Sequence, residues 1–367
     1  MRIIFIGQKG IPATYGGVEK HVEDLATRLV RDGHEVTVYT RKKYTSDKLK
    51  SYKGVELISL PSIATKHLDA ISHTFLACLD VIFRQKADVV HFHSIGPSLL
   101  TWMIKVFKPR TRLVATFHSQ CYNHQKWGSL AKFFLHMGEW MICTVPDKTI
   151  TVSRSLTSYA AEKYGKTTTY IPNGVEVMAQ KEADLIKKWG LESGNYIVTI
   201  SRLVRHKGIQ YLIDAYKQID TKKKLVIVGD GAFTDDYVHE LKDLAGNNPN
   251  IIFTGNQSGE ILQELFSNAF LFVQPSESEG LSIALLEAMS YGRPVLVSDI
   301  LENVEIVNSV GFVFANKKVD DLTLKLRAVL LMDEAVLQEN ALKLKSIVAN
   351  NYNWGNIVRE IEVLYKK

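Results

Sequence analysis

The sequence predicts an α/β fold with two doubly wound parallel sheets, one in each of two domains. Short apolar runs alternate with helical segments along the chain, as expected for parallel strands joined by crossover helices. This alternation restarts after Pro172-Asn173-Gly174, and 367 residues are enough for about two domains. We therefore expect an N-terminal domain over residues 1–172 and a C-terminal domain over residues 173–353, both Rossmann-like.

Five apolar runs in the first half have the composition of strands that are buried on both faces. Between the first two runs, apolar residues at helical spacing predict a helix from about Gly17 to Asp32, and Gly33 is suited to close it. The expected strands are residues 2–7, 35–40, 87–93, 112–118 and 148–153.

The second half repeats the pattern, with a helix expected from about Gly208 to Ile219 and a final helix over residues 354–367. Because ligands of such sheets bind at the carboxyl ends of the strands, the residues that follow each strand are candidate site residues. Two such sheets facing each other are expected to form a cleft. The expected strands are residues 195–201, 224–229, 250–255, 269–274 and 294–298.

The composition is that of a globular protein, with 46% apolar and 23% charged residues. No run reaches the roughly 18 apolar residues that a membrane helix needs, and the first residues lack the pattern of a signal peptide. The cysteines Cys78, Cys121 and Cys143 have no metal-ligand spacing, which favours a reducing compartment. These features predict a cytoplasmic protein.

Positive charge is concentrated in the first half of the chain. Residues 1–172 contain 24 Lys and Arg and 13 Asp and Glu, a net charge of +11, whereas residues 173–367 have a net charge of −5. A basic half indicates an anionic partner, for which nucleic acid and an anionic membrane surface are the two candidates. A solvated basic surface without a partner explains the same charge.

The most informative motif follows the expected strand that ends at Gln274. Gly280 permits a tight turn, and a helix that begins near Ser282 would present free backbone N–H groups and a positive dipole end to a phosphate. Glu279 precedes this helix and Glu287 lies about two turns into it, where carboxylates suit the hydroxyls of a sugar or a ribose. An ordinary helix with an acidic N-terminal loop is the alternative.

A basic segment follows the strand that opens the second half. Arg202 and Lys207 flank the turn before Gly208, where two cations would neutralise a diphosphate and the charge that develops as it leaves. Such cations replace a divalent metal, and no carboxylate cluster in the sequence requires one. A solvated basic loop is the alternative interpretation.

Two further motifs lie at strand ends of the first half. Gly16 and Gly17 allow a ligand to approach the backbone before a helix, but the segment is not GxGxxG, which disfavours a classical NAD site. His91 and His93 alternate along one strand and therefore share a face, but a metal site would need a third ligand that the sequence does not define. His118 is the better candidate for a contact to a sugar or an acceptor.

Together these residues resemble the retaining glycosyltransferases of family 4, which have the GT-B fold. The resemblance covers nearly the whole chain, and its most specific element is the pair Glu279 and Glu287 with seven residues between them. The stretch of residues 11–19 is similar to a subgroup that includes bacterial rhamnosyltransferases of surface-polysaccharide assembly.

The resemblance implies a role for each motif of the second half in binding a nucleotide-sugar donor. Arg202 and Lys207 would hold the donor diphosphate. Glu279, with the backbone N–H groups of Gly280, Leu281 and Ser282, would contact the transferred sugar. Glu287 would bind the ribose hydroxyls, and the loop with Asn256 and Gln257 matches the position of the nucleotide base.

In the first half, the resemblance places Gly16 and Gly17 against the phosphates or the sugar. His118 matches the histidine of a His-Asp pair near the sugar, but Ser119 stands where the family has Asp, so acceptor contacts are expected to differ. The final helix, residues 354–367, resembles a segment that returns to the first domain. No cofactor and no essential metal are implied.

The predicted activity is that of a metal-independent hexosyltransferase in cell-surface polysaccharide synthesis, acting on a saccharide or a lipid-linked acceptor. A nucleotide-sugar epimerase of GT-B fold and a non-catalytic nucleotide-sugar-binding protein are the alternatives. Nucleic acid is disfavoured as a partner because the basic half lacks a motif that reads RNA or DNA.

Basic and aromatic residues occur together in two stretches of the first half, around Trp102 to Arg112 and around Lys126 to Phe134. Such stretches suit peripheral binding to the inner face of an anionic membrane. Buried aromatic residues beside solvated lysines are the alternative explanation.

Overall fold

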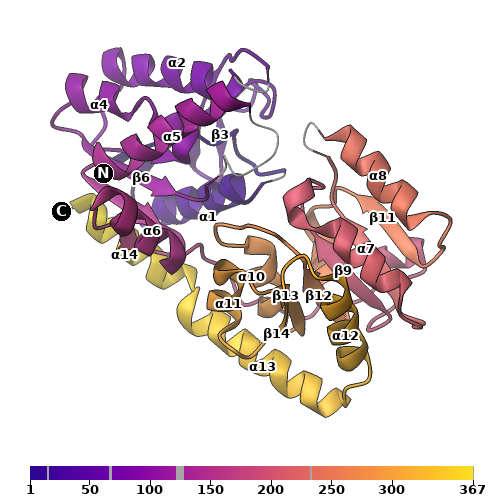
Figure 1. Ribbon diagram of the computed structural model, residues 1–367. Helices are drawn as coiled ribbons and strands as arrows, with labels where there is room; N and C mark the ends of the chain where they lie inside the picture. The colour runs from indigo at the N-terminus through magenta and orange to yellow at the C-terminus, as the bar shows by residue number, and fades with distance from the viewer. Residues whose placement is uncertain (15, 66–67, 121–127, 232–233, 367) are drawn as a thin grey trace. The chain divides into compact units, whose positions relative to one another are not determined.

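The computed structural model describes all residues except 15, 66–67, 121–127, 232–233 and 367. The chain divides into two compact units (Figure 1). Unit 1 comprises Met1–Asn173 and Trp354–Lys367, and unit 2 comprises Gly174–Asn353. Each unit has its own sheet and its own apolar core, so the predicted α/β fold with two sheets is confirmed.

Unit 1 contains an eight-stranded sheet in the order β3-β4-β2-β1-β5-β6-β7-β8. Its strands are β1 (Arg2–Ile6), β2 (Glu35–Arg41), β3 (Ser51–Tyr52), β4 (Val55–Leu60), β5 (Val89–His93), β6 (Arg112–Phe117), β7 (Lys148–Thr151) and β8 (Thr169–Tyr170). Its helices are α1 (Gly17–Arg31), α2 (Asp69–Phe83), α3 (Ile95–Ser98), α4 (Thr101–Phe107), α5 (Ser129–Thr144), α6 (Arg154–Tyr164) and α14 (Trp354–Lys366).

Unit 2 contains a six-stranded sheet in the order β11-β10-β9-β12-β13-β14, in which every neighbouring pair is parallel. Its strands are β9 (Tyr196–Ile200), β10 (Lys224–Val228), β11 (Ile251–Gly255), β12 (Leu271–Gln274), β13 (Val295–Ser298) and β14 (Phe312–Phe314). Its helices are the 3₁₀ turns η2 (Leu185–Trp189) and η3 (Arg205–Lys207), and α7 (Ile209–Lys217), α8 (Asp235–Ala245), α9 (Gly259–Ser267), α10 (Ile283–Ser290), α11 (Leu301–Val307), α12 (Val319–Leu330) and α13 (Glu334–Asn351).

The sheet of unit 1 departs from the purely parallel prediction at one edge. Strands β3 and β4 form an antiparallel hairpin, with Tyr52 opposite Val55. The two turn residues, Lys53 and Gly54, both have positive φ values, 48° and 83°, as a tight hairpin turn requires. The sequence did not predict this hairpin, because β3 is only two residues long and exposed in part.

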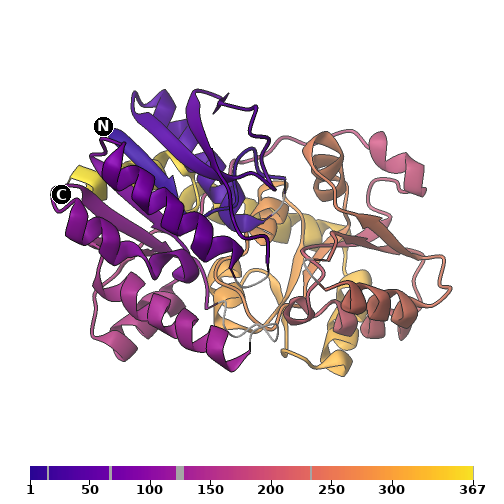
Figure 2. The same cartoon turned by 90° about the horizontal axis from the view of Figure 1, so that it is seen from above.

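The final helix α14 belongs to the core of unit 1. Trp354, Ile357, Ile361 and Tyr365 are at most 4% exposed and pack in one apolar cluster with α1 and the sheet. The helix lies beside α1 (Figure 1, Figure 2). The Tyr365 hydroxyl is 2.7 Å from His91 Nδ1, so the chain end is joined to β5 as well.

Each sheet reverses its strand order once. In unit 2 the reversal lies between β9 and β12, and in unit 1 it lies between β1 and β5. In open parallel sheets, ligands bind outside the carboxyl ends of the strands at this switch point. The segments that follow these four strands are therefore the positions at which a site is expected. Over the described parts of the chain, no helix has the length and apolarity that crossing a membrane requires.

Candidate active site

Two segments that carry predicted site residues meet at the switch point of unit 2. One follows β9 and the other follows β12, and these strands are neighbours in the sheet. The two segments are joined through their backbones, since the N–H of Glu277 donates to the carbonyl of His206 at 2.8 Å. The adjacency of the two motifs therefore follows from the strand order.

The segment after β9 turns closely against the segment after β12. Arg202 follows the strand and is half-buried, and the 3₁₀ turn η3 ends at Lys207. Gly208 then adopts φ +70°, and a Cβ atom there would lie 1.9 Å from the carbonyl oxygen of Pro275. Only glycine fits this position, because both the backbone conformation and the contact exclude a side chain.

Lys207 and Glu279 form an ion pair across the two segments. Lys207 Nζ lies 2.5 Å from Glu279 Oε1, and the side chains are only 15% and 9% exposed. Ser276 Oγ donates to the same carboxylate oxygen at 2.7 Å. The pair fixes a cation and a carboxylate within one hydrogen-bond length, at the edge where open parallel sheets generally bind their ligands.

Helix α10 begins at this same place. Ser282 is its N-cap, and the Ser282 hydroxyl accepts from the N–H of Leu285 at 3.2 Å. That hydroxyl also donates to Gln274 Oε1 at 2.6 Å, and Gln274 Nε2 donates to Asn303 Oδ1 at 2.7 Å. This buried network holds the helix end beside β12, where its N–H groups and dipole favour an anion.

The remaining predicted residues of unit 2 lie at the same edge of the sheet. Gly280 and Leu281 are buried just before α10, and Glu287 is half-buried in the second turn of that helix. Asn256 and Gln257 follow β11, with Gln257 Nε2 donating to the carbonyl of Thr254 at 2.6 Å. Strand β10 separates β11 from β9, so these two residues lie farther along the edge from the ion pair.

The glycine-rich segment after β1 lies at the switch point of unit 1. Gly16 has φ +103° and is the N-cap of α1, which begins at Gly17. Glu19 of this helix accepts from the N–H of Lys9 at 3.0 Å, and Glu23 accepts from the N–H of Ala13 at 2.6 Å. The helix therefore holds the described part of the segment by its backbone; Tyr15 lies outside the described residues.

Four histidines form a buried cluster at the strand ends of unit 1. The rings of His91 and His93 stack at 4.3 Å, which confirms that they share a face. His93 Nδ1 lies 3.1 Å from His118 Nε2, and the ring of His21 from α1 is 5.1 Å from that of His118. One ligand nitrogen from each of His21, His93 and His118 lies within 4.8 Å of the others. His91 is outside this group, because its two ring nitrogens lie 2.7 Å from the hydroxyls of Tyr365 and Thr116, so the pair considered from the sequence does not form the group.

Burial keeps this cluster neutral. Desolvation lowers the pKa of His21 to about 4, because its ring is enclosed by the core. Desolvation also holds the pKa of His91, His93 and His118 well below the ordinary value, and neighbouring histidines lower it further. Neutral imidazoles donate and accept hydrogen bonds, which suits contacts to hydroxyl groups.

We expect unit 1 to lose stability between pH 6.5 and pH 5. The unfolded chain binds protons at histidine near pH 6.5, whereas His21 in the folded chain stays neutral until about pH 4. Stability is therefore complete above pH 6.5 and falls with pH, by up to about 1.4 kcal/mol per pH unit for each such histidine. Urea unfolding from pH 7.5 to pH 5 measures this slope, and His21→Leu is expected to reduce it. A flat profile from pH 6.5 to 5 in the wild type would contradict the assignment.

The structure thus brings together Lys207, Glu279 and the start of α10 in unit 2, with Arg202 on the same segment as Lys207, and it brings together His118, His21 and His93 in unit 1. The sequence analysis missed His21, Gln274, Ser276 and Asn303. His21 follows the paired glycines within one helical turn, which was the available signal for it. Gln274 ends β12, Ser276 follows it and Asn303 lies in α11, and no motif distinguishes these polar residues in the sequence.

Two family models match adjoining parts of the chain. The model described as Glycosyltransferase Family 4 matches residues 15–178, and the model described as Glycosyl transferases group 1 matches residues 181–344. The protein is a GT-B glycosyltransferase. The predicted enzyme class and fold are therefore confirmed.

The glycosyltransferase is similar to several known proteins over most or all of its length. An uncharacterised glycosyltransferase of Methanocaldococcus jannaschii is 28% identical, over 100% of this chain and 98% of its own. The alpha-monoglucosyldiacylglycerol synthase of Streptococcus pneumoniae is 25% identical, over 76% of this chain and 67% of its own. The crystal structure of Anabaena HepE in complex with UDP-glucose has the same fold, with a TM-score of 0.83, 19% identity and full coverage of both chains.

Proposed function

We propose that this glycosyltransferase moves a sugar from a nucleoside-diphosphate sugar to an acceptor hydroxyl, with retention of anomeric configuration. The observation that carries the proposal is the meeting of the Lys207–Glu279 pair and the start of α10 at the switch point of unit 2. A cation and a helix N-terminus at one position suit a diphosphate. The related HepE structure holds UDP-glucose, which supports a donor of this class.

Each residue of the unit 2 site then has a proposed role. Arg202, Lys207 and the N–H groups at the start of α10, near Gly280 to Ser282, bind the diphosphate and the sugar-phosphate oxygens. Glu279 accepts hydrogen bonds from the transferred sugar. Because these cations lie where a metal would otherwise neutralise the diphosphate, we propose that no metal is essential.

Binding of the nucleoside involves the other predicted residues of unit 2. Glu287 binds the ribose hydroxyls, and Asn256 and Gln257 lie on the segment proposed for the base. The roles predicted for Gly16, Gly17 and His118 of unit 1 stay predictions.

We attribute the rate enhancement to stabilisation of the negative charge that develops on the leaving diphosphate. As the bond from the sugar C1 to the phosphate oxygen breaks, negative charge grows on that oxygen, and Arg202, Lys207 and the α10 dipole stabilise it. The acceptor hydroxyl attacks C1 on the face that the diphosphate leaves, and its proton passes to the departing phosphate oxygen. This route needs no nucleophilic side chain of the enzyme.

The acceptor is proposed to be carried on a lipid, in the synthesis of a cell-surface polysaccharide at the inner face of the membrane. The name of the streptococcal relative describes a glucosylated diacylglycerol, which supports a lipid acceptor. Residues 11–19 favour a rhamnosyl donor on the resemblance alone.

A donor panel tests the proposed function. Nucleoside-diphosphate sugars, including the rhamnosyl donor, are incubated with simple and lipid-linked acceptors, and released nucleoside diphosphate is measured. One donor is expected to give acceptor-dependent release, and the product is expected to keep the donor's anomeric configuration. Isomerised sugar from donor alone would identify an epimerase, and binding without turnover in the whole panel would favour a binding protein.

We expect Glu287→Gln to raise the KM for the donor about tenfold while changing kcat much less. Loss of a charged acceptor for the ribose hydroxyls costs about 1.5 kcal/mol or more, and the lost contact is equally strong in the ground state and the transition state. Glu339→Gln on α13 is the matched control, since this glutamate is exposed and pairs only with Lys343 in the described contacts. An unchanged KM would remove the ribose role from Glu287.

A further inference from the structure

Helix α5 of unit 1 has apolar residues on two faces. One face packs inward, with Leu135, Gly138 and Ile142 buried. The other face points to solvent although five of its side chains are large and apolar. These residues, which we call the α5 face, are between 36% and 72% exposed: Leu130, Phe133, Phe134, Met137 and Trp140.

The spacing of the α5 face is that of one continuous helical stripe. Its members follow one another at intervals of one or three residues, so they line a single side of the helix. Exposed apolar residues that occur singly need no explanation, whereas a stripe of five on one helix marks an interaction surface. The alternative that these aromatic residues are buried is therefore wrong for Phe133 and Phe134.

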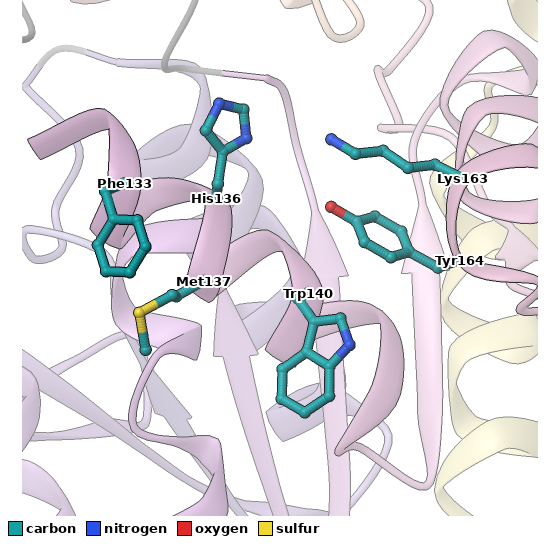
Figure 3. A pocket seen from close by; sticks show the side chains of 6 residues that line it. All are labelled: Phe133, His136, Met137, Trp140, Lys163 and Tyr164. Atoms are coloured by element: carbon teal, nitrogen blue, oxygen red, sulfur yellow. The ribbon is translucent and has the colours of Figure 1, made fainter. Parts of the chain in front are cut away.

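A groove of about 350 Å³ runs along this helix, and α6 forms its other side (Figure 3). From α5 it is lined by Phe133, His136, Met137 and Trp140, and from α6 by Lys163 and Tyr164.

The side chains from α6 are held in place by Glu139. This carboxylate is fully buried and accepts hydrogen bonds from Lys163 Nζ at 2.8 Å and from the Tyr164 hydroxyl at 2.5 Å. Burial alone would lower the pKa of Lys163, but the bonds to Glu139, Tyr159 and Tyr164 raise it above its ordinary value. The groove therefore has an apolar floor and, at its rim, the ion pair of Lys163 with the buried Glu139.

The exposed charge of α5 itself is positive. Lys132 is exposed, whereas Glu139, the one acidic residue of α5, is 0% exposed and is paired with Lys163 of α6. The first 172 residues carry a net charge of +11. A second copy of this surface would bring like charges together, whereas an anionic lipid surface offers both phosphates for Lys132 and acyl chains for the aromatic rings.

We propose that the α5 face docks on the surface of an anionic lipid bilayer. The helix lies in the plane of the interface, its 16 residues extending about 24 Å. Phe133, Phe134 and Trp140 enter the boundary between headgroups and acyl chains, and Lys132 contacts lipid phosphates. The inference deepens the lipid-linked acceptor of the proposed function, because the same contact would bring the enzyme to such an acceptor.

Co-sedimentation of the full chain with vesicles tests the docking surface. The wild type is expected to bind vesicles that contain phosphatidylglycerol and to bind pure phosphatidylcholine weakly. The double variant Phe133→Gln with Trp140→Gln is expected to lose at least about tenfold in the partition coefficient, because two apolar side chains no longer leave water. The matched control is Leu301→Gln with Leu331→Gln in unit 2, where both leucines are more than 70% exposed, and it is expected to bind like the wild type.

Two outcomes would overturn the docking proposal. One is a wild type that does not bind the anionic vesicles, and the other is a Phe133 and Trp140 double variant that binds them equally well. Sedimentation velocity of the same variants without lipid examines the competing occupant: a wild-type dimer that the double variant loses would assign the surface to a second copy of the chain.

The failure of this inference is distinguishable from a failure of the proposed function. Transfer to a soluble saccharide acceptor is expected to be the same in the double variant and the wild type, because the α5 face lies outside the donor site. Equal melting temperatures of the two proteins show that the exposed substitutions leave the fold intact. A double variant that loses both vesicle binding and transfer to the soluble acceptor would contradict the assignment of this helix to docking.

Discussion

Replacing Lys207 with alanine is expected to lower kcat by about 10²- to 10³-fold, a loss typical of removing one group that stabilises transition-state charge. Lys207 lies beside Glu279 at the start of α10, where the leaving diphosphate is proposed to acquire charge. The effect on kcat should exceed the effect on the KM for the donor, because the cation is needed most when the bond to the sugar breaks. Steady-state kinetics with the donor found in the panel measure both constants. Arg202→Ala is expected to behave in the same way.

The matched control for Lys207 is Arg205→Ala. Both cations belong to the 3₁₀ turn η3, and both pair with a glutamate, but Arg205 is exposed and pairs with Glu240. Arg205→Ala is expected to keep kcat within about twofold of the wild type, as for other exposed ion pairs. Equal rates in Lys207→Ala and the wild type would contradict the charge-stabilisation role. Urea unfolding of the variant shows whether the unpaired Glu279 has cost stability instead.

The second large effect concerns stability. Gly208→Ala is expected to lower the free energy of unfolding of unit 2 by about 3 kcal/mol or more, through left-handed backbone strain and displacement of a backbone neighbour. The added Cβ would lie 1.9 Å from the carbonyl oxygen of Pro275, so one of the two site segments must move. The donor KM is expected to rise as well, because the same contact sets the distance between Lys207 and Glu279.

Gly255→Ala separates these two causes. Gly255 has the same φ of +70° in the same unit, but a Cβ atom there would meet nothing within 4 Å. Gly255→Ala is therefore expected to lower the free energy of unfolding through backbone strain alone, by about 1 kcal/mol. The difference between the two variants, measured by urea unfolding, reports the clash with Pro275. Equal losses in both variants would show that the segments after β9 and β12 are not held at this contact.

Much of the fold could be predicted because apolar runs and helical spacing are local signals. The expected strands after which the site residues follow, such as residues 195–201 and 269–274, were found as β9 and β12 with bounds shifted by one or two residues. The short edge strands β3, β8 and β14 were missed, since two or three residues give no periodic pattern. The six-residue strand β4 was missed as well.

The candidate site was predictable only in part, because which of its residues meet depends on tertiary structure. Sequence motifs identify residues that follow strands, and the strand order then decides which of them meet. The ion pair between Lys207 and Glu279 spans 72 positions of the chain and depends on β9 and β12 being neighbours. His21 and His118 likewise meet through the packing of α1 on its sheet. The hydrogen bonds of Lys163 and Tyr164 to the buried Glu139 depend on the contact of α5 with α6.

A crystal structure with the intact donor bound tests the central claim most directly. The donor diphosphate is expected outside β9 and β12 of unit 2, with its oxygens contacting Arg202, Lys207 and the N–H groups at the start of α10, and with the sugar against Glu279. A diphosphate bound at another edge of the sheet, with these side chains directed away from it, would contradict the account.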